Sequence, residues 1–178
     1  FLIDGSGKSV RPDLRSAISE ITSETALVVA LDGITDPHNL GAILRSVDLF
    51  EADFVILPAK RSARLNPTVT KTSAGASNYV PVVSIPNLTR GLEELKRAEF
   101  WIYVADAVGK PAYKVDLTGK VALVMGSEGR GLGRLIRERC DEILSIPVRG
   151  NIDSLNVSVA AGICIYEARR QQDFSYKR

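Results

Sequence analysis

The sequence has few of the residues that build metal sites and disulfide frameworks. Its 178 residues include one histidine, His38, and two cysteines, Cys140 and Cys164, which lie far apart and form no C-x-x-C pair. A single histidine excludes zinc sites built from several histidines and leaves little room for a Ser-His-Asp triad. His38 lies in the polar run DPHN, where a turn residue is the simplest interpretation. Two separated cysteines favour a reducing, cytoplasmic setting without a disulfide, and we expect no metal ion.

The sequence also lacks long apolar runs. No stretch of about 20 apolar residues is present, and no charged-then-apolar leader opens the chain, so we expect no membrane span and no signal segment. With 45% hydrophobic and 25% charged residues, the composition fits one globular domain with a sizeable core. The first residue is Phe1 rather than Met, and residues 1–25 are polar and irregular. We therefore expect a linker from an upstream part over residues 1–25, with at most a short helix, and a globular domain over residues 26–178.

Acidic residues are absent from a long internal segment. Residues 54–92 contain no Asp or Glu, although the net charge of the whole chain is only +2. The same segment carries clustered cations, among them Lys60, Arg61, Arg64 and Lys71. This distribution favours a surface that faces phosphates and therefore an RNA partner, although a solvated basic face would show the same pattern.

Apolar runs and helical periodicity alternate from residue 26 onward. The expected strands are 26–33, 54–58, 80–85, 101–107, 121–126 and 142–148, and the expected helices are 39–50, 66–77, 87–99, 131–140 and 154–172. This alternation predicts an α/β fold with a mainly parallel sheet and helices on both faces. Such sheets bind ligands outside the carboxyl ends of their strands, so the informative loops are 32–39, 104–109, 125–131 and 146–154.

Two glycine-rich stretches resemble nucleotide-binding loops only in part. GSGKS (5–9) lacks the first glycine of a Walker loop, because that position is Leu2, and an ATP-binding enzyme is therefore disfavoured. GSEGRGLG (126–133) follows a strong strand, but its glycine spacing does not fit the dinucleotide pattern. What remains is a tight turn around Glu128, where the backbone can approach a ligand closely, or a turn with a purely structural role.

The stretch SLNVSVAAGICIYEA (154–168) begins with polar residues and continues as an apolar helix. Its apolar body predicts a helix buried on every side. Ser154 is a credible N-cap, and Asn156 and Ser158 exceed what capping requires. We expect a ligand or a polar network to satisfy them, although Ser158 could bond to a carbonyl four residues earlier.

The expected helix 39–50 carries two further candidates. Arg45 follows a strand-end loop and stands beside apolar residues, which fits either a functional cation or a solvated surface arginine. Asn39 lies six residues earlier and is most simply the N-cap of this helix.

Three ordered segments resemble the SpoU branch of the SPOUT methyltransferases, which are RNA 2′-O-ribose methyltransferases. LDGITDPHNLGAILRS (31–46) is similar to the first family motif, with its Asn and the Arg six residues later. VALVMGSEGRGL (121–132) is similar to the second motif, which contains a Gly-x-Glu-Gly turn. LSIPVRGNIDSLNVSVAAGICIYEA (144–168) is similar to the third. The resemblance covers roughly residues 26–172, and no motif position departs from the family pattern.

The resemblance implies a parallel α/β sheet whose C-terminal part threads through a loop as a deep trefoil knot. It also implies S-adenosylmethionine as the cofactor, contacted largely through backbone atoms of Gly126, Ile146 and Leu155. A homodimer with active sites near the subunit interface follows from the same resemblance.

The resemblance further assigns the catalytic role to Arg45. Because an arginine side chain holds its proton tightly, we expect Arg45 to grip the target phosphate and stabilise the alkoxide, with proton removal through it or water. Glu128 is expected to orient Arg45 or a main-chain donor. Asn39, Ser154 and Asn156 are expected to order the motif loops and the ribose.

Within the family, segment 71–96 is more similar to enzymes that act on a guanosine of 23S ribosomal RNA than to the tRNA guanosine enzymes. The short tail QQDFSYKR (171–178) agrees, because the tRNA enzymes usually carry added basic terminal helices. The rRNA enzymes have an N-terminal RNA-binding domain, which fits the expected linker. Two alternatives stay open: a tRNA guanosine 2′-O-methyltransferase, and a knotted module that binds RNA without catalysis.

Overall fold

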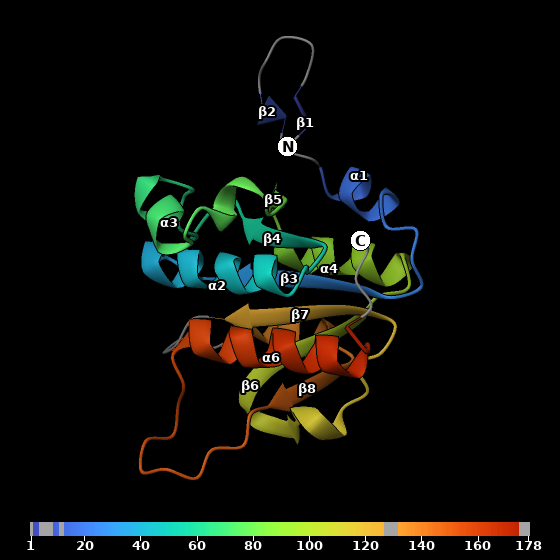
Figure 1. The fold of residues 1–178 in the computed structure, drawn as a ribbon. Helices are drawn as coiled ribbons and strands as arrows, with labels where there is room; N and C mark the ends of the chain where they lie inside the picture. Colours follow the sequence, from blue (N-terminus) through green and yellow to red (C-terminus); the bar gives the residue numbers. More distant parts are fainter. Residues whose placement is uncertain (1, 4–8, 11–12, 127–131, 175–178) are drawn as a thin grey trace.

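The computed structural model describes residues 2–3, 9–10, 13–126 and 132–174 (Figure 1). The N-terminal part consists of β1 (Leu2–Ile3), β2 (Ser9–Val10) and α1 (Leu14–Ser19), and β1 pairs with β2 in antiparallel fashion. The elements that follow are β3 (Ala26–Asp32), α2 (Pro37–Leu49), β4 (Phe54–Pro58), α3 (Pro67–Thr72), the short 3-10 helix η1 (Ala76–Asn78), β5 (Val82–Ile85), α4 (Leu88–Arg97), β6 (Trp101–Pro111), the 3-10 helix η2 (Ala112–Lys114), β7 (Lys120–Gly126), α5 (Arg134–Arg139), β8 (Glu142–Ser145) and α6 (Val157–Gln171).

The predicted parallel sheet is confirmed. Six strands lie in the order β5-β4-β3-β7-β6-β8, and each neighbouring pair is parallel. The chain leaves β3 toward β4 and β5, and later returns to β7 on the other side of β3, so the strand order reverses between β3 and β7. The crevice outside the carboxyl ends of such strands is where open α/β sheets bind ligands.

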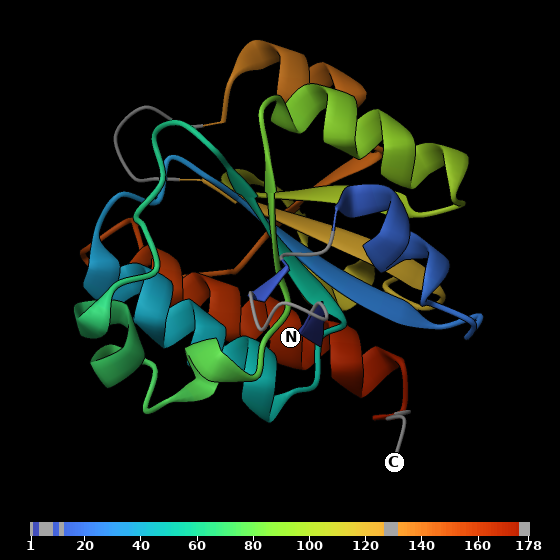
Figure 2. The ribbon, with the colours of Figure 1, turned by 90° about the horizontal axis from the view of Figure 1, so that it is seen from above.

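Alternate residues of the strands face two separate cores. In β3, Leu27, Val29 and Leu31 join a core that includes residues of α2 and α6. Ala26, Val28 and Ala30 join a second core with residues of α1, α4 and α5. Because both faces are covered, the central strands are apolar throughout rather than alternating with polar residues. Figure 2 shows α2, α3 and α6 on one side of the sheet and α1, α4 and α5 on the other, which confirms the prediction of helices on both faces.

The structure corrects several expected boundaries. Helix 66–77 is two short helices, α3 and η1, because Ala74 and Gly75 adopt positive φ values of 53° and 87° between them. The strand expected at 101–107 continues to Pro111. The short helix allowed for within residues 1–25 is α1, which packs Leu14 and Ala17 into the second core, and the role of residues 1–25 as a linker stays a prediction.

The N-caps of two helices differ from the expected ones. Helix α2 begins at Pro37 and is capped by Asp36, whose carboxylate accepts the His38 N–H, so Asn39 lies inside the helix. Helix α6 begins at Val157 and is capped by Asn156 rather than by Ser154. In both cases the residue directly before the first helical residue accepts N–H groups that the helix end leaves unpaired. Helix α4 is capped by Asn87, whose Oδ1 accepts the Arg90 N–H at 3.0 Å.

Helix α6 was expected to be buried on every side, and that expectation is wrong for this chain. Val159, Ile163 and Tyr166 are 50%, 41% and 47% exposed and recur at helical spacing along one face. The opposite face carries Ala161, Cys164, Ile165 and Ala168 into the first core. No helix in the described ranges is long and apolar enough to cross a membrane.

The last turn of α6 is tied to the sheet by buried polar groups. Arg169 is 3% exposed, and its side chain donates hydrogen bonds to the carbonyls of Phe50 and Glu51, which directly follow α2. Its Nη1 donates to Gln172 Oε1 at 2.7 Å. Gln172 Nε2 in turn donates to the carbonyls of Ala26 and Gly119 at 3.2 and 3.1 Å. These bonds join α6, the end of α2 and the starts of β3 and β7.

Replacing Arg169 by alanine should therefore destabilise the fold. We expect Arg169→Ala to lower the free energy of unfolding by about 2–4 kcal/mol, because the carbonyls of Phe50 and Glu51 and the Gln172 side chain lose the donor that Arg169 supplies. Arg170→Ala, which removes an exposed arginine paired with Glu167, is the matched control and should change stability little. Urea denaturation followed by circular dichroism measures both. Equal, small losses in the two variants would show that the buried network contributes nothing specific.

Candidate functional site

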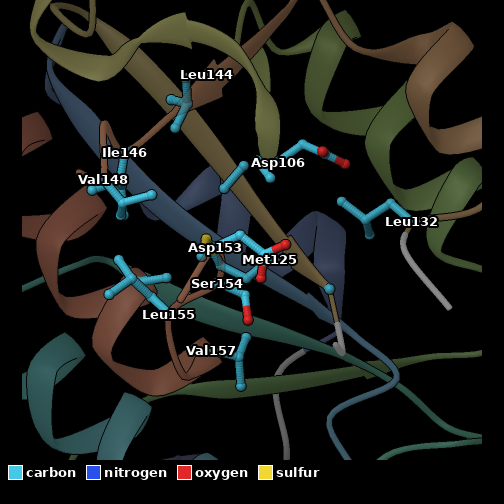
Figure 3. A pocket seen from close by; sticks show the side chains of 14 residues that line it. Asp106, Met125, Leu132, Leu144, Ile146, Val148, Asp153, Ser154, Leu155 and Val157 are labelled. Atoms are coloured by element: carbon cyan, nitrogen blue, oxygen red, sulfur yellow. The ribbon is translucent and has the colours of Figure 1, made fainter. Parts of the chain in front are cut away.

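A cavity of about 290 Å³ opens at the carboxyl ends of β6, β7 and β8 (Figure 3). Its lining comes from the second half of β6, the end of β7, Leu132, and the segment that joins β8 to α6. The lining residues are Ala105, Asp106, Ala107, Met125, Gly126, Leu132, Leu144, Ile146, Val148, Asp153, Ser154, Leu155, Val157 and Ala160. Most of these side chains are apolar, and a few polar groups lie among them, which is typical of sites for small organic ligands.

Close backbone approaches shape this cavity. A Cβ added to Gly126 would lie 2.7 Å from Leu132 Cγ, so only glycine lets the Leu132 side chain close over the end of β7. The pairing of β6 with β8 shifts register between Ala105 and Lys110. Within that irregular segment, a Cβ on Gly109 would lie 2.7 Å from the Ile143 carbonyl oxygen. The irregularity turns Ala105, Asp106 and Ala107 toward the cavity instead of continuing a regular ladder.

The three residues expected to contact a cofactor meet in this one cavity. Gly126 ends β7, Ile146 follows β8, and Leu155 lies just before α6. All three line the cavity, together with Ser154. Their convergence from separate sequence segments is a finding of the structure, and their role toward a cofactor stays a prediction.

Asn156 links the start of α6 to the start of α2. Its Oδ1 accepts the N–H groups of Ser158 and Val159 at 2.9 and 3.4 Å, and its Nδ2 donates to Asn39 Oδ1 at 3.0 Å. The Ser158 hydroxyl donates to the same Asn156 oxygen. Ser158 therefore bonds to the cap residue rather than to the carbonyl four residues earlier, and the polar network expected here is present.

Arg45 does not line the cavity. It is exposed on α2, and its side chain forms no hydrogen bond or ion pair with another residue in the described part of the chain. The neighbouring Ser46 faces α6, where its hydroxyl lies 3.4 Å from the position of a Cβ on Gly162. Glu128, expected to orient Arg45, lies outside the described residues.

The basic segment predicted to face RNA is solvent-accessible. Lys60, Arg61, Arg64 and Lys71 are all exposed on the segment between β4 and η1. The Ala63 N–H in this segment donates to the Ile34 carbonyl at 2.7 Å, which fixes it beside the loop before α2. His38 is also exposed and lies in the first turn of α2 rather than in a free turn.

Two carboxylates of the cavity were not predicted from the sequence. Asp106 and Asp153 both line it, and the Asp106 carboxylate pairs with the Arg137 guanidinium of α5. The loop 104–109 was flagged as a strand-end segment, but nothing in the sequence indicated that Asp106 would meet Arg137, 31 residues further on. Among the described residues, no group of three or more His, Cys, Asp or Glu side chains could hold a metal ion.

Comparison with known proteins gives a family match that covers most of the chain. A family model described as the SpoU rRNA Methylase family matches residues 26–166, from the first residue of β3 into α6. The chain belongs to the SpoU family. The predicted resemblance is therefore confirmed.

Two SpoU relatives show how far the similarity extends. The 23S rRNA (guanosine-2′-O-)-methyltransferase RlmB of Photorhabdus laumondii is 47% identical over 161 residues, covering 90% of this chain and 65% of that protein. The protein of the same name from Ralstonia nicotianae is 49% identical over 147 residues, covering 82% and 59%. The chain thus spans less than two thirds of the length of these relatives.

Solved structures agree on the fold. The SpoU methyltransferase AviRb from Streptomyces viridochromogenes, in complex with the cofactor AdoMet, has a TM-score of 0.77 at 29% identity, covering 86% of this chain and 63% of that one. The TrmH/SpoU tRNA modifying enzyme of A. aeolicus has a TM-score of 0.75 at 30% identity, covering 90% and 81%. The first shows that a SpoU fold of this kind holds S-adenosylmethionine.

The cap formed by Asn156 can be tested separately from its contact with Asn39. Asn156→Ala should lower the free energy of unfolding by about 1 kcal/mol, because two N–H groups of α6 lose their acceptor. Asn156→Ser should stay close to the parent protein, since serine also caps well, although it cannot reach Asn39. Chemical denaturation of the three proteins measures the difference. Equal losses for alanine and serine would mean that the cap is not what Asn156 contributes.

Proposed function

We propose that this chain transfers a methyl group from S-adenosylmethionine to the 2′-hydroxyl of a guanosine ribose in 23S ribosomal RNA. One observation carries the proposal: the end of β7 and the segment that joins β8 to α6 bring Gly126, Ile146 and Leu155 together around one cavity. The relatives named for this reaction on 23S rRNA support the substrate class, at 46–49% identity. Residues 26–178 would form the methyltransferase domain, and residues 1–25 would join it to an upstream part. The protein would act in the cytoplasm.

The cavity suits S-adenosylmethionine. Its apolar walls can pack against the flat adenine ring, and strand-end backbone groups near Gly126 and Ile146 can hydrogen-bond to it. The Asp153 carboxylate, which also lines the cavity, complements the positive charge of a sulfonium ligand. When bound, this cofactor supplies an activated methyl group, and no metal is needed for the transfer.

The protein must place the ribose oxygen in line with the methyl carbon and help to remove a proton. We assign Arg45 the task of gripping the target phosphate and stabilising the developing alkoxide, with proton removal through it or through water. Its exposure and its lack of a partner among the described residues leave the guanidinium available for RNA. An arginine can bind a phosphate through two parallel hydrogen bonds.

The remaining site residues would hold the reacting groups in order. The Asn39–Asn156 bond connects the starts of α2 and α6, and Ser154, two residues before Asn156, lines the cavity. We propose that these three side chains order the motif loops and the target ribose. Glu128 keeps its expected role of orienting Arg45 or a main-chain donor.

The RNA would lie over the basic segment that contains Lys60, Arg61, Arg64 and Lys71. All four cations are exposed, and a carboxylate-free segment attracts phosphates over several ångströms. The segment is held beside the loop that leads to Asn39 by the Ala63–Ile34 hydrogen bond. The surface for the RNA backbone would therefore adjoin the catalytic residues.

We also propose a homodimer and a knotted C-terminus, both implied by the family resemblance. The exposed row of Val159, Ile163 and Tyr166 on α6, with Leu49 of α2 at 65% exposure, supplies apolar surface that a second copy could cover. The segment between β8 and α6 supports the knot, because it crosses the cavity beside β6 and β7 before α6 packs on the sheet.

Methyl transfer from tritiated S-adenosylmethionine tests the proposed reaction and substrate. We expect the chain to label 23S rRNA that lacks the modification, and to label tRNA far less. If a correctly folded protein labelled neither RNA, the result would favour the alternative of a module that binds RNA without catalysis. Strong labelling of tRNA alone would overturn the substrate and favour the tRNA enzyme.

Replacing Arg45 tests its catalytic role. Arg45→Ala should lower turnover at least tenfold and leave cofactor affinity unchanged, because Arg45 lies outside the cavity lining. Arg97→Ala, an exposed arginine of α4 on the opposite side of the sheet, is the matched control. Single-turnover kinetics and calorimetry with S-adenosylhomocysteine measure the two quantities. More than about a tenth of the parent turnover in Arg45→Ala would contradict the assignment.

A further inference from the structure

Asp106 occupies an unusual position for a carboxylate. It lies in the irregular part of β6, lines the cavity, and keeps only 18% of its side chain exposed. In Figure 3 its carboxylate lies toward Leu132, across the cavity from Ile146, Val148 and Leu155. Those facing side chains are apolar, so a flat apolar group packed against them would leave its polar edge toward Asp106.

Two donors fix the Asp106 carboxylate. Oδ1 accepts the Val108 N–H at 3.1 Å, and Oδ2 accepts a hydrogen bond from Arg137 Nη2. Arg137 is itself held, because its Nε donates to the Leu132 carbonyl at 3.4 Å. The guanidinium also compensates for the partial burial of the carboxylate, which would otherwise be unfavourable. Arg137 therefore acts as a positioning residue for Asp106.

The fixed carboxylate still has acceptor capacity. An ionised carboxyl group offers about four lone-pair sites, and within the described residues each Asp106 oxygen accepts one hydrogen bond. A lone pair on each oxygen remains for a ligand in the cavity. Two adjacent acceptors at a fixed spacing match two vicinal hydroxyl groups, and acidic side chains bind ribose hydroxyls in this way in dinucleotide sites.

We propose that Asp106, braced by Arg137, accepts hydrogen bonds from the ribose hydroxyls of the nucleoside part of S-adenosylmethionine. This inference rests on the proposed function, because it names a contact within the same cavity. It makes Asp106 a determinant of cofactor affinity and not of the chemical step. It also explains why the protein places an acidic side chain among apolar lining residues.

Two other roles for Asp106 have to be separated from this one. Its carboxylate could instead pair with the ammonium group of the methionine part, or it could serve only as a strut that ties α5 to β6. An ammonium contact disappears when the ligand lacks the amino acid. A strut does not distinguish between ligands with and without ribose hydroxyls.

Calorimetric titration with four ligands separates these roles: S-adenosylhomocysteine, 5′-methylthioadenosine, and the 2′-deoxy and 3′-deoxy forms of methylthioadenosine. Asp106→Ala should weaken the first two about tenfold, the loss expected for one or two hydrogen bonds to a charged acceptor. At least one deoxy ligand should bind the parent protein more weakly than 5′-methylthioadenosine does. The affinity for that ligand should fall less than about twofold further in Asp106→Ala. Asp106→Asn, which keeps the size of the side chain, carries the same comparison if the alanine variant does not fold.

Two further variants complete the experiment. Arg137→Ala should show the same ligand pattern as Asp106→Ala in weaker form, and Arg137→Lys should partly restore binding, because lysine also supplies a cationic donor. Asp48→Ala, which removes an exposed carboxylate of α2 outside the cavity, is the control and should bind all ligands as the parent does.

Each outcome has one meaning. Equal losses for all four ligands would reduce Asp106 to a strut, and a loss seen with S-adenosylhomocysteine but not with methylthioadenosine would move the contact to the ammonium group. Either result would overturn the inference and leave the proposed function intact. A parent protein that binds neither S-adenosylhomocysteine nor methylthioadenosine would overturn the proposed function itself.

Discussion

The attachment of α6 to the sheet is the constraint on which the rest of the site depends. Arg169 and Gln172 bind carbonyl groups at the end of α2 and at the starts of β3 and β7, so the C-terminal end of α6 cannot shift along the sheet. With that end fixed, the other end of α6 places Asn156 beside Asn39. The segment from Ile146 to Leu155 must then cross the carboxyl ends of the strands, where it forms one wall of the cavity.

Much of the fold could be predicted because the signals were local. The central strands are apolar throughout, and parallel sheets with two covered faces require that pattern. The ends of the helices were harder to predict, since they depend on which of several neighbouring polar residues caps the helix. Asp36 and Asn156 cap their helices, where Asn39 and Ser154 were the expected caps. The break after α3 depends on two positive φ angles that no periodicity reports.

Some residues of the candidate site could likewise be predicted from the sequence, and others could not. Motif resemblance located Gly126, Ile146 and Leu155, and the structure brings them together. The motifs gave no indication of the ion pair between Asp106 and Arg137, because that contact joins the irregular part of β6 to α5, which lies elsewhere in the sequence. The exposed face of α6 was not predicted either. An apolar sequence predicts a buried helix, but it does not say whether the same chain or another one buries it.

The double use of the Asn156 amide has a consequence for motion. Its oxygen holds the first N–H groups of α6 while its nitrogen holds Asn39, so fraying of the helix start and displacement of the α2 loop are one event. A ligand that displaces Leu155 would therefore change both the first turn of α6 and the loop before α2. Local opening of this corner is therefore cooperative, and amide hydrogen exchange at the first turn of α6 would report on the order of a loop in a distant part of the sequence.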